Sequence, residues 1–127
     1  MAGRLYDGFV PGRHAIDAYG NGGFRFADMS HKGSILALPS GIKALDAREP
    51  ADLTREALAP ALAEADAIEL LLVGTGRDLA RLDEAVLWAL REAGLRVETM
   101  QTGAAARTYT ILLGEGRRVA AALLAVP

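Results

Sequence analysis

The amino-acid sequence predicts an α/β fold, and three features carry that prediction. The apolar run IELLLVGTG (68–76) ends in glycines and precedes a segment rich in helix formers. The block TMQTGAAARTYTILLGEGRRVAAALLAVP (99–127) repeats the order of apolar strand, glycine-bearing turn and helix. Residues 68–100 form one strand–helix–strand unit, and such units almost always join parallel strands through a right-handed crossover.

Length and composition indicate a soluble protein with one domain, residues 1–127. The absence of cysteine excludes disulfides, thiolate metal ligands and a cysteine nucleophile. The net charge is −2, and no basic block is longer than Arg117-Arg118, so we expect no nucleic-acid partner. No apolar stretch approaches the roughly 20 residues of a membrane span, and the N-terminus lacks the layout of a signal peptide. We therefore expect a cytoplasmic protein that does not span a membrane.

The first part of the chain reads as an irregular lead-in (1–12) followed by a mainly β region (13–47). Alternating residues over 14–19 predict a short strand, and Gly20-Asn21-Gly22-Gly23 predicts a tight turn. Period-two phenylalanines predict a paired strand at 24–26. Two further apolar runs follow, a clear one at 34–38 and a weaker one at 42–47.

Residues 51–127 alternate between helix and strand. We expect a helix over 51–65 with Asp52 or Thr54 as its N-cap and a kink at Pro60. Further elements are a strand at 68–73, a helix at 82–93 stopped by Gly94, and a strand at 95–100. Thr102 is predicted to cap a helix over 103–113. After the turn Gly114-Glu115-Gly116, residues 117–126 read as a long apolar strand with a central place in the sheet.

Five motifs stand in order between residues 14 and 126: IDAYGNGGFRF (16–26), HKGS (31–34) with LPSG (38–41), ELLLVGTG (69–76), ETMQTGAAARTY (98–109) and EGRRVAAALLAV (115–126). Together they resemble one small domain-of-unknown-function family, whose eukaryotic members include mitochondrial complex I assembly factor 3 and the adipogenesis-associated Mth-like domain protein. Two positions depart from the family pattern. Thr110 replaces an asparagine, and Leu82-Asp83 stand where a proline is common.

The resemblance implies a three-layer domain with a mixed central β-sheet flanked by helices and an additional N-terminal β layer. For the mitochondrial relatives it implies a role near respiratory complex I assembly, with protein partners that include complex I components. It implies no settled activity for bacterial members. The chain has no transit peptide, so it resembles a bacterial, cytoplasmic member.

A small anion-accepting cleft is the first candidate site. Gly74, Thr75, Gly76 and Arg77 follow one strand, and Thr102-Gly103, with Arg107, opens the next helix. Ligands in open α/β sheets bind at the carboxyl ends of the strands, so parallel neighbours would bring both turns to one edge. Plain structural turns, with Arg107 paired to a surface carboxylate, are the alternative. The dinucleotide fingerprint fails because its last position is Leu79.

Two aromatic residues are candidates for a protein interface. Trp88 lies away from the apolar stripe of its helix, so it is either a partly exposed anchor or covered by a second layer. Tyr109 lies in an apolar helix stripe, where a core position competes with a donor role for its hydroxyl.

No catalytic set or metal site is expected. His14 and His31 are the only histidines and lack further ligands at metal-binding spacing. Ser34 follows His31 closely, yet no acidic orienter or nucleophile-elbow motif accompanies it. We expect no cofactor. Two functional interpretations remain, a non-enzymatic assembly-factor-like module that binds proteins, and a small-molecule or anion binder or enzyme that uses the cleft. Self-association is compatible with both.

Overall fold

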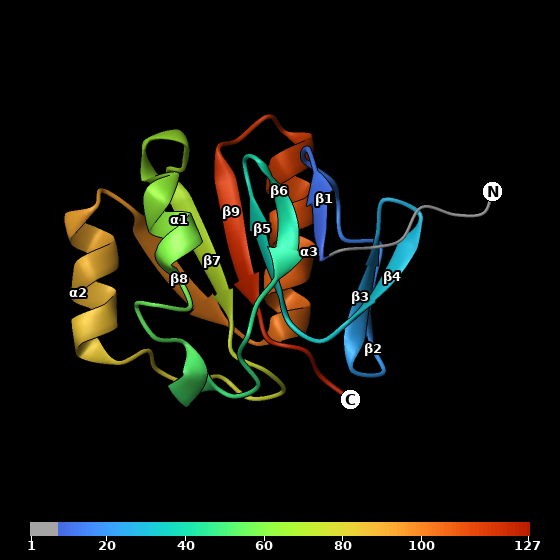
Figure 1. Cartoon of the computed structure of the whole chain (residues 1–127), viewed down its shortest axis with the longest axis horizontal. Helices are drawn as coiled ribbons and strands as arrows, with labels where there is room; N and C mark the ends of the chain where they lie inside the picture. The colour runs from blue at the N-terminus through green and yellow to red at the C-terminus, as the bar shows by residue number, and fades with distance from the viewer. Residues whose placement is uncertain (1–7) are drawn as a thin grey trace.

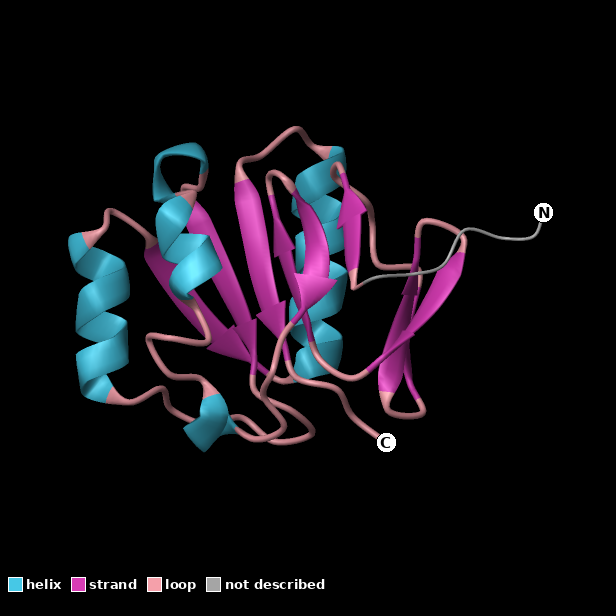
Figure 2. Ribbon diagram, viewed as in Figure 1, coloured by secondary structure: helices cyan, strands magenta, loops and turns pink. Residues whose placement is uncertain are grey.

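A computed structural model describes residues 8–127, and its core is a six-stranded mixed sheet with helices on both faces (Figures 1 and 2). The predicted fold class is therefore confirmed. The strands of this sheet lie in the order β1-β6-β5-β9-β7-β8. Their bounds are Phe9–Pro11 (β1), Ile35–Leu38 (β5), Gly41–Ala44 (β6), Leu70–Gly74 (β7), Arg96–Met100 (β8) and Val119–Leu123 (β9).

The last strand, β9, occupies the centre of the sheet, as its apolar sequence predicted. It runs parallel to β7 and antiparallel to β5. All five of its residues are buried, because strands flank it on both edges and other elements cover both faces. The regular strand is shorter than the predicted 117–126.

The predicted strand–helix–strand unit consists of β7, α2 (Glu84–Glu92) and β8, and its two strands are parallel neighbours. Asp83 caps α2 by accepting a hydrogen bond from the N–H of Ala85 at 3.1 Å. Val86 and Leu90 bury the inner stripe of the helix. Gly94 has a φ of 92°, so it supplies the left-handed turn that ends the helix.

Alternate residues of β7 divide the core into two clusters. Leu71 and Val73 face α1 and α2, whereas Leu70 and Leu72 face α3 (Thr102–Gly114) on the opposite side. Figure 1 shows α1 and α2 in front of the sheet and α3 behind it. A strand covered on both faces needs apolar residues at every position, which explains the unbroken run in β7.

A second, three-stranded antiparallel sheet supplies the expected N-terminal β layer. It contains β2 (Ala18–Gly20), β3 (Gly23–Phe26) and β4 (Met29–Lys32). Phe24 and Phe26 insert from β3 into the cluster on the α3 side of the main sheet. The predicted pairing of the first two strands is confirmed, although only residues 18–20 of the predicted strand 14–19 are regular.

One prediction for the N-terminal region is corrected, and one strand there was not predicted. Residues 1–7 of the expected lead-in lie outside the described residues, but Phe9–Pro11 form strand β1, which pairs with β6. Strand β4 carried no strong sequence signal. It follows a turn in which Ala27 and Asp28 have φ angles of 51° and 61°. This is the left-handed conformation, and an alanine in the sequence does not predict it.

The predicted helix over 51–65 is wrong in extent. The regular α-helix is α1 (Ala59–Ala63), flanked by 3-10 turns at Pro50–Asp52 and Ala65–Ala67. Pro60 lies in the first turn of α1 and does not kink a longer helix, because a proline disfavours helical geometry in the residue before it. Asp52 accepts hydrogen bonds from the N–H groups of Arg48 and Glu49, and Thr54 accepts one from Ala57, so both candidate caps serve short turns.

Candidate functional site

The two glycine turns of the predicted cleft meet at one edge of the sheet. Strands β7 and β8 are parallel and in register, so Gly74 lies opposite Met100 at their carboxyl ends. The first turn follows Gly74, and α3 begins two residues after Met100. This is the edge where open α/β sheets bind ligands.

Hydrogen bonds between the turns occupy the polar groups closest to the sheet. The N–H of Thr102 donates to the carbonyl of Gly76, and the N–H of Gly76 donates to the Thr102 hydroxyl, both at 2.9 Å. The N–H of Thr75 donates to the carbonyl of Met100 at 2.8 Å. These N–H groups therefore connect the two turns and are not available to an anion.

Thr102 does not cap its own helix, contrary to the prediction. Gln101 is the N-cap residue, and no side chain closes that cap. The hydroxyl of Thr102 instead donates to the carbonyl of Leu124 at 2.7 Å and is fully buried. Thr102 thus connects three segments, the turn after β7, the start of α3 and the end of β9.

Close packing explains the glycine at position 74. A Cβ atom built there would lie 2.9 Å from the Cα of Thr102 and 3.0 Å from its hydroxyl oxygen. Thr75 is buried beside it. Its hydroxyl lies 2.8 Å from the carbonyl of Asp78 and accepts a hydrogen bond from the N–H of Ala80 at 3.1 Å. Gly74, Thr75 and Thr102 therefore form the floor of the site and not its accessible lining.

Above this floor lies a surface hollow of about 320 Å³. Four predicted site residues line it: Gly76, Arg77, Gly103 and Arg107. Sequence reasoning missed the other lining residues, which come from β2, from the start of α3 and from the segment after β9: Tyr19, Gln101, Ala104 and Val126.

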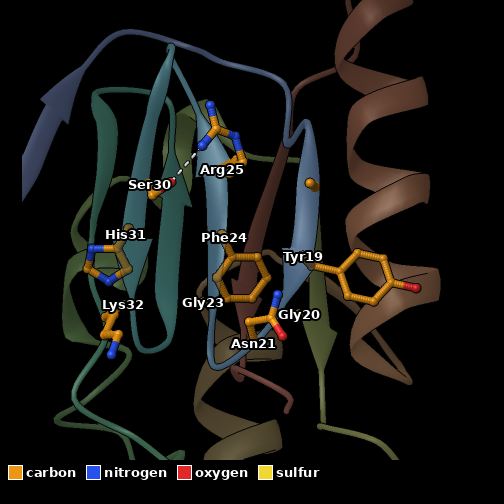
Figure 3. Close-up of a pocket in the computed structure, with 10 residues that line it drawn as sticks. Tyr19, Gly20, Asn21, Gly23, Phe24, Arg25, Ser30, His31 and Lys32 are labelled. Carbon is orange, nitrogen blue, oxygen red and sulfur yellow. Dashed lines mark hydrogen bonds between the residues drawn. The ribbon is translucent and has the colours of Figure 1, made fainter.

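Tyr19 is the missed residue that does most to shape the site. It reaches from β2 toward α3, as Figure 3 shows, and its hydroxyl lies against Gly103. A Cβ atom at position 103 would collide with that hydroxyl. The N-terminal β layer therefore forms one wall of the hollow, which no local sequence signal could indicate.

The hollow carries positive charge. Arg77 and Arg107 are both exposed, and within residues 8–127 neither forms an ion pair with a carboxylate. The predicted alternative, in which Arg107 pairs with a surface carboxylate, is therefore wrong for the described part of the chain. The positive end of the α3 dipole lies at the same place.

A second hollow, of about 410 Å³, continues along α3 and shares Tyr19 and Arg107 with the first. It lies between α3 and the segment before and within β2, and is also lined by Ile16, Asp17, Ala18, Ala106, Thr110 and Ile111. The hydroxyl of Thr110 accepts a hydrogen bond from the N–H of Ile16 at 3.0 Å. Thr110, one of the two departures from the family pattern, thus holds the β layer against the helix. We call the two joined hollows the α3 groove.

The three-stranded sheet carries a further shallow hollow of about 380 Å³ (Figure 3). Its lining includes Gly23, which is buried, and Arg25, Ser30 and Lys32, which are exposed. Arg25 donates a hydrogen bond to the Ser30 hydroxyl at 2.8 Å. The lining also includes the rings of Tyr19 and Phe24, and among the described residues it contains no acidic residue that could form an acid–base pair.

The remaining polar candidates have structural roles. The Ser34 hydroxyl donates to the carbonyl of Ala47 at 2.7 Å and accepts from the N–H of Ala125 at 2.9 Å. His31 is buried, and its Nε2 lies 3.2 Å from the carbonyl of Ser34. Burial lowers the pKa of His31, and the hydrogen bond to that carbonyl partly offsets the shift. His14 Nε2 lies 2.8 Å from the carbonyl of Pro11.

The two interface candidates, Tyr109 and Trp88, differ in exposure to solvent. Tyr109 is 1% exposed, so its candidacy as an interface residue is wrong and its place is the core. Burial raises the pKa of Tyr109 to about 12, and the charge of Arg13 offsets part of that increase. Trp88 is 65% exposed, so no layer formed by residues 8–127 covers it.

Residues 8–127 contain no group of three histidine, cysteine, aspartate or glutamate side chains arranged to hold a metal ion. In the same residues, no helix combines the length and apolar character needed to cross a membrane.

Comparison with known proteins places the chain in a family. Residues 16–124 match the family described as protein of unknown function DUF498/DUF598. The chain belongs to this family. A Rhodobacter capsulatus relative is 41% identical over 113 residues, which are 88% of this chain and 85% of that protein. The predicted resemblance is therefore confirmed.

The chain is also similar to NADH dehydrogenase [ubiquinone] 1 alpha subcomplex assembly factor 3. The mouse protein is 33% identical over 112 residues, 88% of this chain but 60% of the mouse protein, so the match spans little more than half of that relative. A crystal structure of a Bartonella henselae protein, described as an outer membrane protein, is 55% identical with a TM-score of 0.89, over 92% of this chain and 98% of that one.

Proposed function

We propose that this chain is a non-enzymatic, assembly-factor-like module that binds a protein partner. The observation that carries the proposal is the similarity to assembly factor 3, which extends over 88% of this chain. The proposed partners are components of respiratory complex I or other assembly proteins. The proposed setting is the bacterial cytoplasm. A chain without cysteine suits that reducing compartment, and the Rhodobacter relative supports a bacterial origin.

The bonding of the polar side chains supports a binding role over catalysis. The hydroxyls of Ser34, Thr75 and Thr102 are all engaged with backbone groups. A serine or threonine nucleophile needs a neighbouring base within hydrogen-bond reach, and these hydroxyls contact carbonyls and N–H groups. The hydroxyl groups of Ser34, Thr75 and Thr102 therefore stabilise the fold.

The α3 groove is the proposed contact surface. Its lining combines an exposed aromatic residue (Tyr19), an exposed aliphatic residue (Ile111) and an arginine without an intramolecular ion pair in the described chain (Arg107). Tyrosine and arginine are enriched at the centres of protein interfaces, where one side chain offers both apolar area and hydrogen bonds. Trp88 lies on another element, so this proposal does not require it.

Affinity capture of the tagged protein from mildly cross-linked, detergent-solubilised cells tests the proposal. The variants are Tyr19→Ala and Arg107→Ala, and the matched control is Arg55→Ala, which removes an exposed arginine outside the groove. We expect mass spectrometry to find complex I subunits or assembly proteins with the wild type and the control, and a loss of these proteins with both groove variants. Equal capture by all four proteins, or no specific partner where a known complex is recovered, would refute the proposal.

A second candidate function is the binding of a small anion in the hollow at the start of α3. It is favoured by two arginines, Arg77 and Arg107, that have no carboxylate partner in the described residues. Because Thr75, Gly76 and Thr102 use their N–H groups internally, such an anion would be held by these guanidinium groups and by the N–H groups of Gly103 and Ala104. Phosphate, acetate and nucleotides should then shift the amide resonances of residues 103 and 104, and unchanged spectra would exclude this function.

A further inference from the structure

Strand β8 (Arg96–Met100) lies at the end of the six-stranded sheet. Among the described strands it pairs only with β7, so its other side is a free edge. Helix α2 packs against β8 at this end of the molecule (Figure 1). An exposed edge strand is a template for pairing with another chain unless charge, proline or a bulge prevents it.

The hydrogen bonds to β7 show which backbone groups point to the free edge. The N–H of Arg96 donates to the carbonyl of Glu69, and the carbonyl of Met100 accepts from the N–H of Thr75. Alternate residues of a strand direct their backbone groups to opposite sides. Val97 and Thr99 therefore present their N–H and carbonyl groups to the free edge.

The charges on β8 are complementary to those of a second, antiparallel β8. If Val97 faces Val97 of the other copy, Arg96 of each copy lies opposite Glu98 of the other, which gives two favourable cross-strand pairs. If the register shifts so that Glu98 faces itself, two carboxylates oppose each other. Within one chain, Arg96 and Glu98 are 3.9 Å apart and largely exposed, a weak pair that is free to rearrange.

Helix α2, beside the strand, also carries an acidic and a basic residue that complement those of a second copy. Glu84, Leu87 and Arg91 border a hollow of about 250 Å³ whose other lining includes Val97 and Thr99 of β8. Glu84 and Arg91 are seven residues apart, so they lie on the same side of the helix two turns apart. In a two-fold antiparallel contact centred between them, Glu84 of each copy meets Arg91 of the other. Neither residue has an ion pair elsewhere in residues 8–127.

We infer that the free edge of β8, together with the adjoining side of α2, is the binding surface for a second copy of this chain. The dimer has two-fold symmetry, and the same patch of each subunit contacts its equivalent. The two sheets join through β8, with Val97 on the axis, and the two α2 helices lie antiparallel beside each other. Trp88, 65% exposed and adjacent to Leu87, adds apolar area at the margin of this contact.

The inference is independent of the proposed function, because none of these residues lines the α3 groove. The competing explanation is that Arg96 and Glu98 guard the edge and keep the protein monomeric. The two explanations predict different effects of charge reversal. If Arg96 and Glu98 only prevent association, their charges need no complementary charge at a matching position of a second copy.

Sedimentation velocity of the full chain at increasing concentration, with charge-reversal variants, separates them. Glu84→Arg places two arginines opposite each other in the dimer, and Arg91→Glu places two glutamates opposite each other. Each variant alone should sediment as one copy where the wild type sediments as two. An equimolar mixture should recover the two-copy species, because each arginine of one variant then faces a glutamate of the other.

Arg96→Glu and Glu98→Arg provide a second pair with the same logic on the strand, in case the helix variants lose structure. Circular dichroism of each variant identifies any that unfold. A wild type that stays monomeric at every concentration, a dimer that survives all four reversals, or folded variants whose mixtures remain monomeric would each overturn the inference.

Discussion

Gly76 and Thr102 hold each other through two hydrogen bonds, the Thr102 N–H to the Gly76 carbonyl and the Gly76 N–H to the Thr102 hydroxyl, both at 2.9 Å. The same hydroxyl donates to the carbonyl of Leu124 at 2.7 Å. One buried side chain therefore fixes the turn after β7 and the start of α3 relative to the end of β9. The shape of the proposed site depends on this connection.

Replacing this hydroxyl with a methyl group should destabilise the protein. Thr102→Val keeps the shape of the side chain but leaves the Gly76 N–H and the Leu124 carbonyl without their partner. An unsatisfied buried polar group costs about 1–3 kcal/mol, so we expect a decrease of at least about 1 kcal/mol in the free energy of unfolding. Urea denaturation provides the measurement.

Thr108→Val is the matched control for this change. Thr108 lies on the same helix, is partly exposed and forms no side-chain hydrogen bond with the described chain, so its replacement should change stability by no more than about 0.5 kcal/mol. Equal losses in the two variants would contradict the role assigned to the Thr102 hydroxyl.

The parallel part of the fold could be predicted from the sequence because its signals are local. The unbroken apolar run of β7 and the stop at Gly94 define these elements without knowledge of their neighbours. The central place of β9 followed from an apolar strand with no polar face. These signals also located the two glycine turns, since strand ends mark the sheet edge.

The parts that escaped prediction depend on distant contacts. Strand β4 forms because β3 pairs with it and His31 is buried, although its sequence MSHK has little strand character. The segment before Pro60 buries Leu53 and Leu58. Residues five positions apart do not lie on one face of a helix, so these two do not fit a continuous helix. Tyr19 joins the candidate site from another sheet, and nothing near position 19 indicates its contact with Gly103.

The contact between Tyr19 and Gly103 should appear as coupling in a double-mutant cycle. Gly103→Ala would normally favour a helix by up to about 1 kcal/mol, but the added methyl group displaces the Tyr19 hydroxyl. We expect the change to stabilise the Tyr19→Ala protein more than the wild type, with a coupling energy of at least about 0.5 kcal/mol. Denaturant unfolding of the four proteins gives this coupling directly.

Gly114→Ala serves as the comparison for this cycle. A Cβ atom at Gly114, at the other end of α3, meets no atom within 4 Å. Its effect should be the same with and without Tyr19. Additive effects of Gly103→Ala and Tyr19→Ala would show that the tyrosine does not rest on the helix start in solution.

The stability of the protein should depend on pH through His31. Burial holds the pKa of His31 below its ordinary value of 6.5, so the unfolded chain binds a proton more readily than the folded protein. The corresponding stability is fully present above pH 6.5 and is lost as the pH falls toward the lower folded-state pKa. His31→Gln should reduce the slope of unfolding free energy against pH between about 5 and 7, the range in which imidazole titrates.

Lys32→Gln, which alters an exposed neighbour on the same strand, should keep the wild-type slope. Urea unfolding at a series of pH values gives the slope for each protein. If His31→Gln lowers stability equally at all pH values, His31 contributes packing alone and its protonation is not linked to folding.

A second pH effect should arise from the pair of Glu69 and Arg117, at acid pH. Arg117 Nε donates to the Glu69 carboxylate at 2.9 Å, and this hydrogen bond, with the charge of Arg117, lowers the pKa of Glu69 below 4.5. Stability from the pair is therefore present above pH 4.5 and is lost as the pH falls through the folded-state pKa. Both side chains are well exposed, so the contribution is small and weakens with salt.

Glu69→Gln and Arg117→Gln should each reduce this loss of stability at acid pH, and the double variant should reduce it no further. Additive effects in low-salt unfolding curves would show that the two groups act on stability separately, since a single shared interaction can be removed only once.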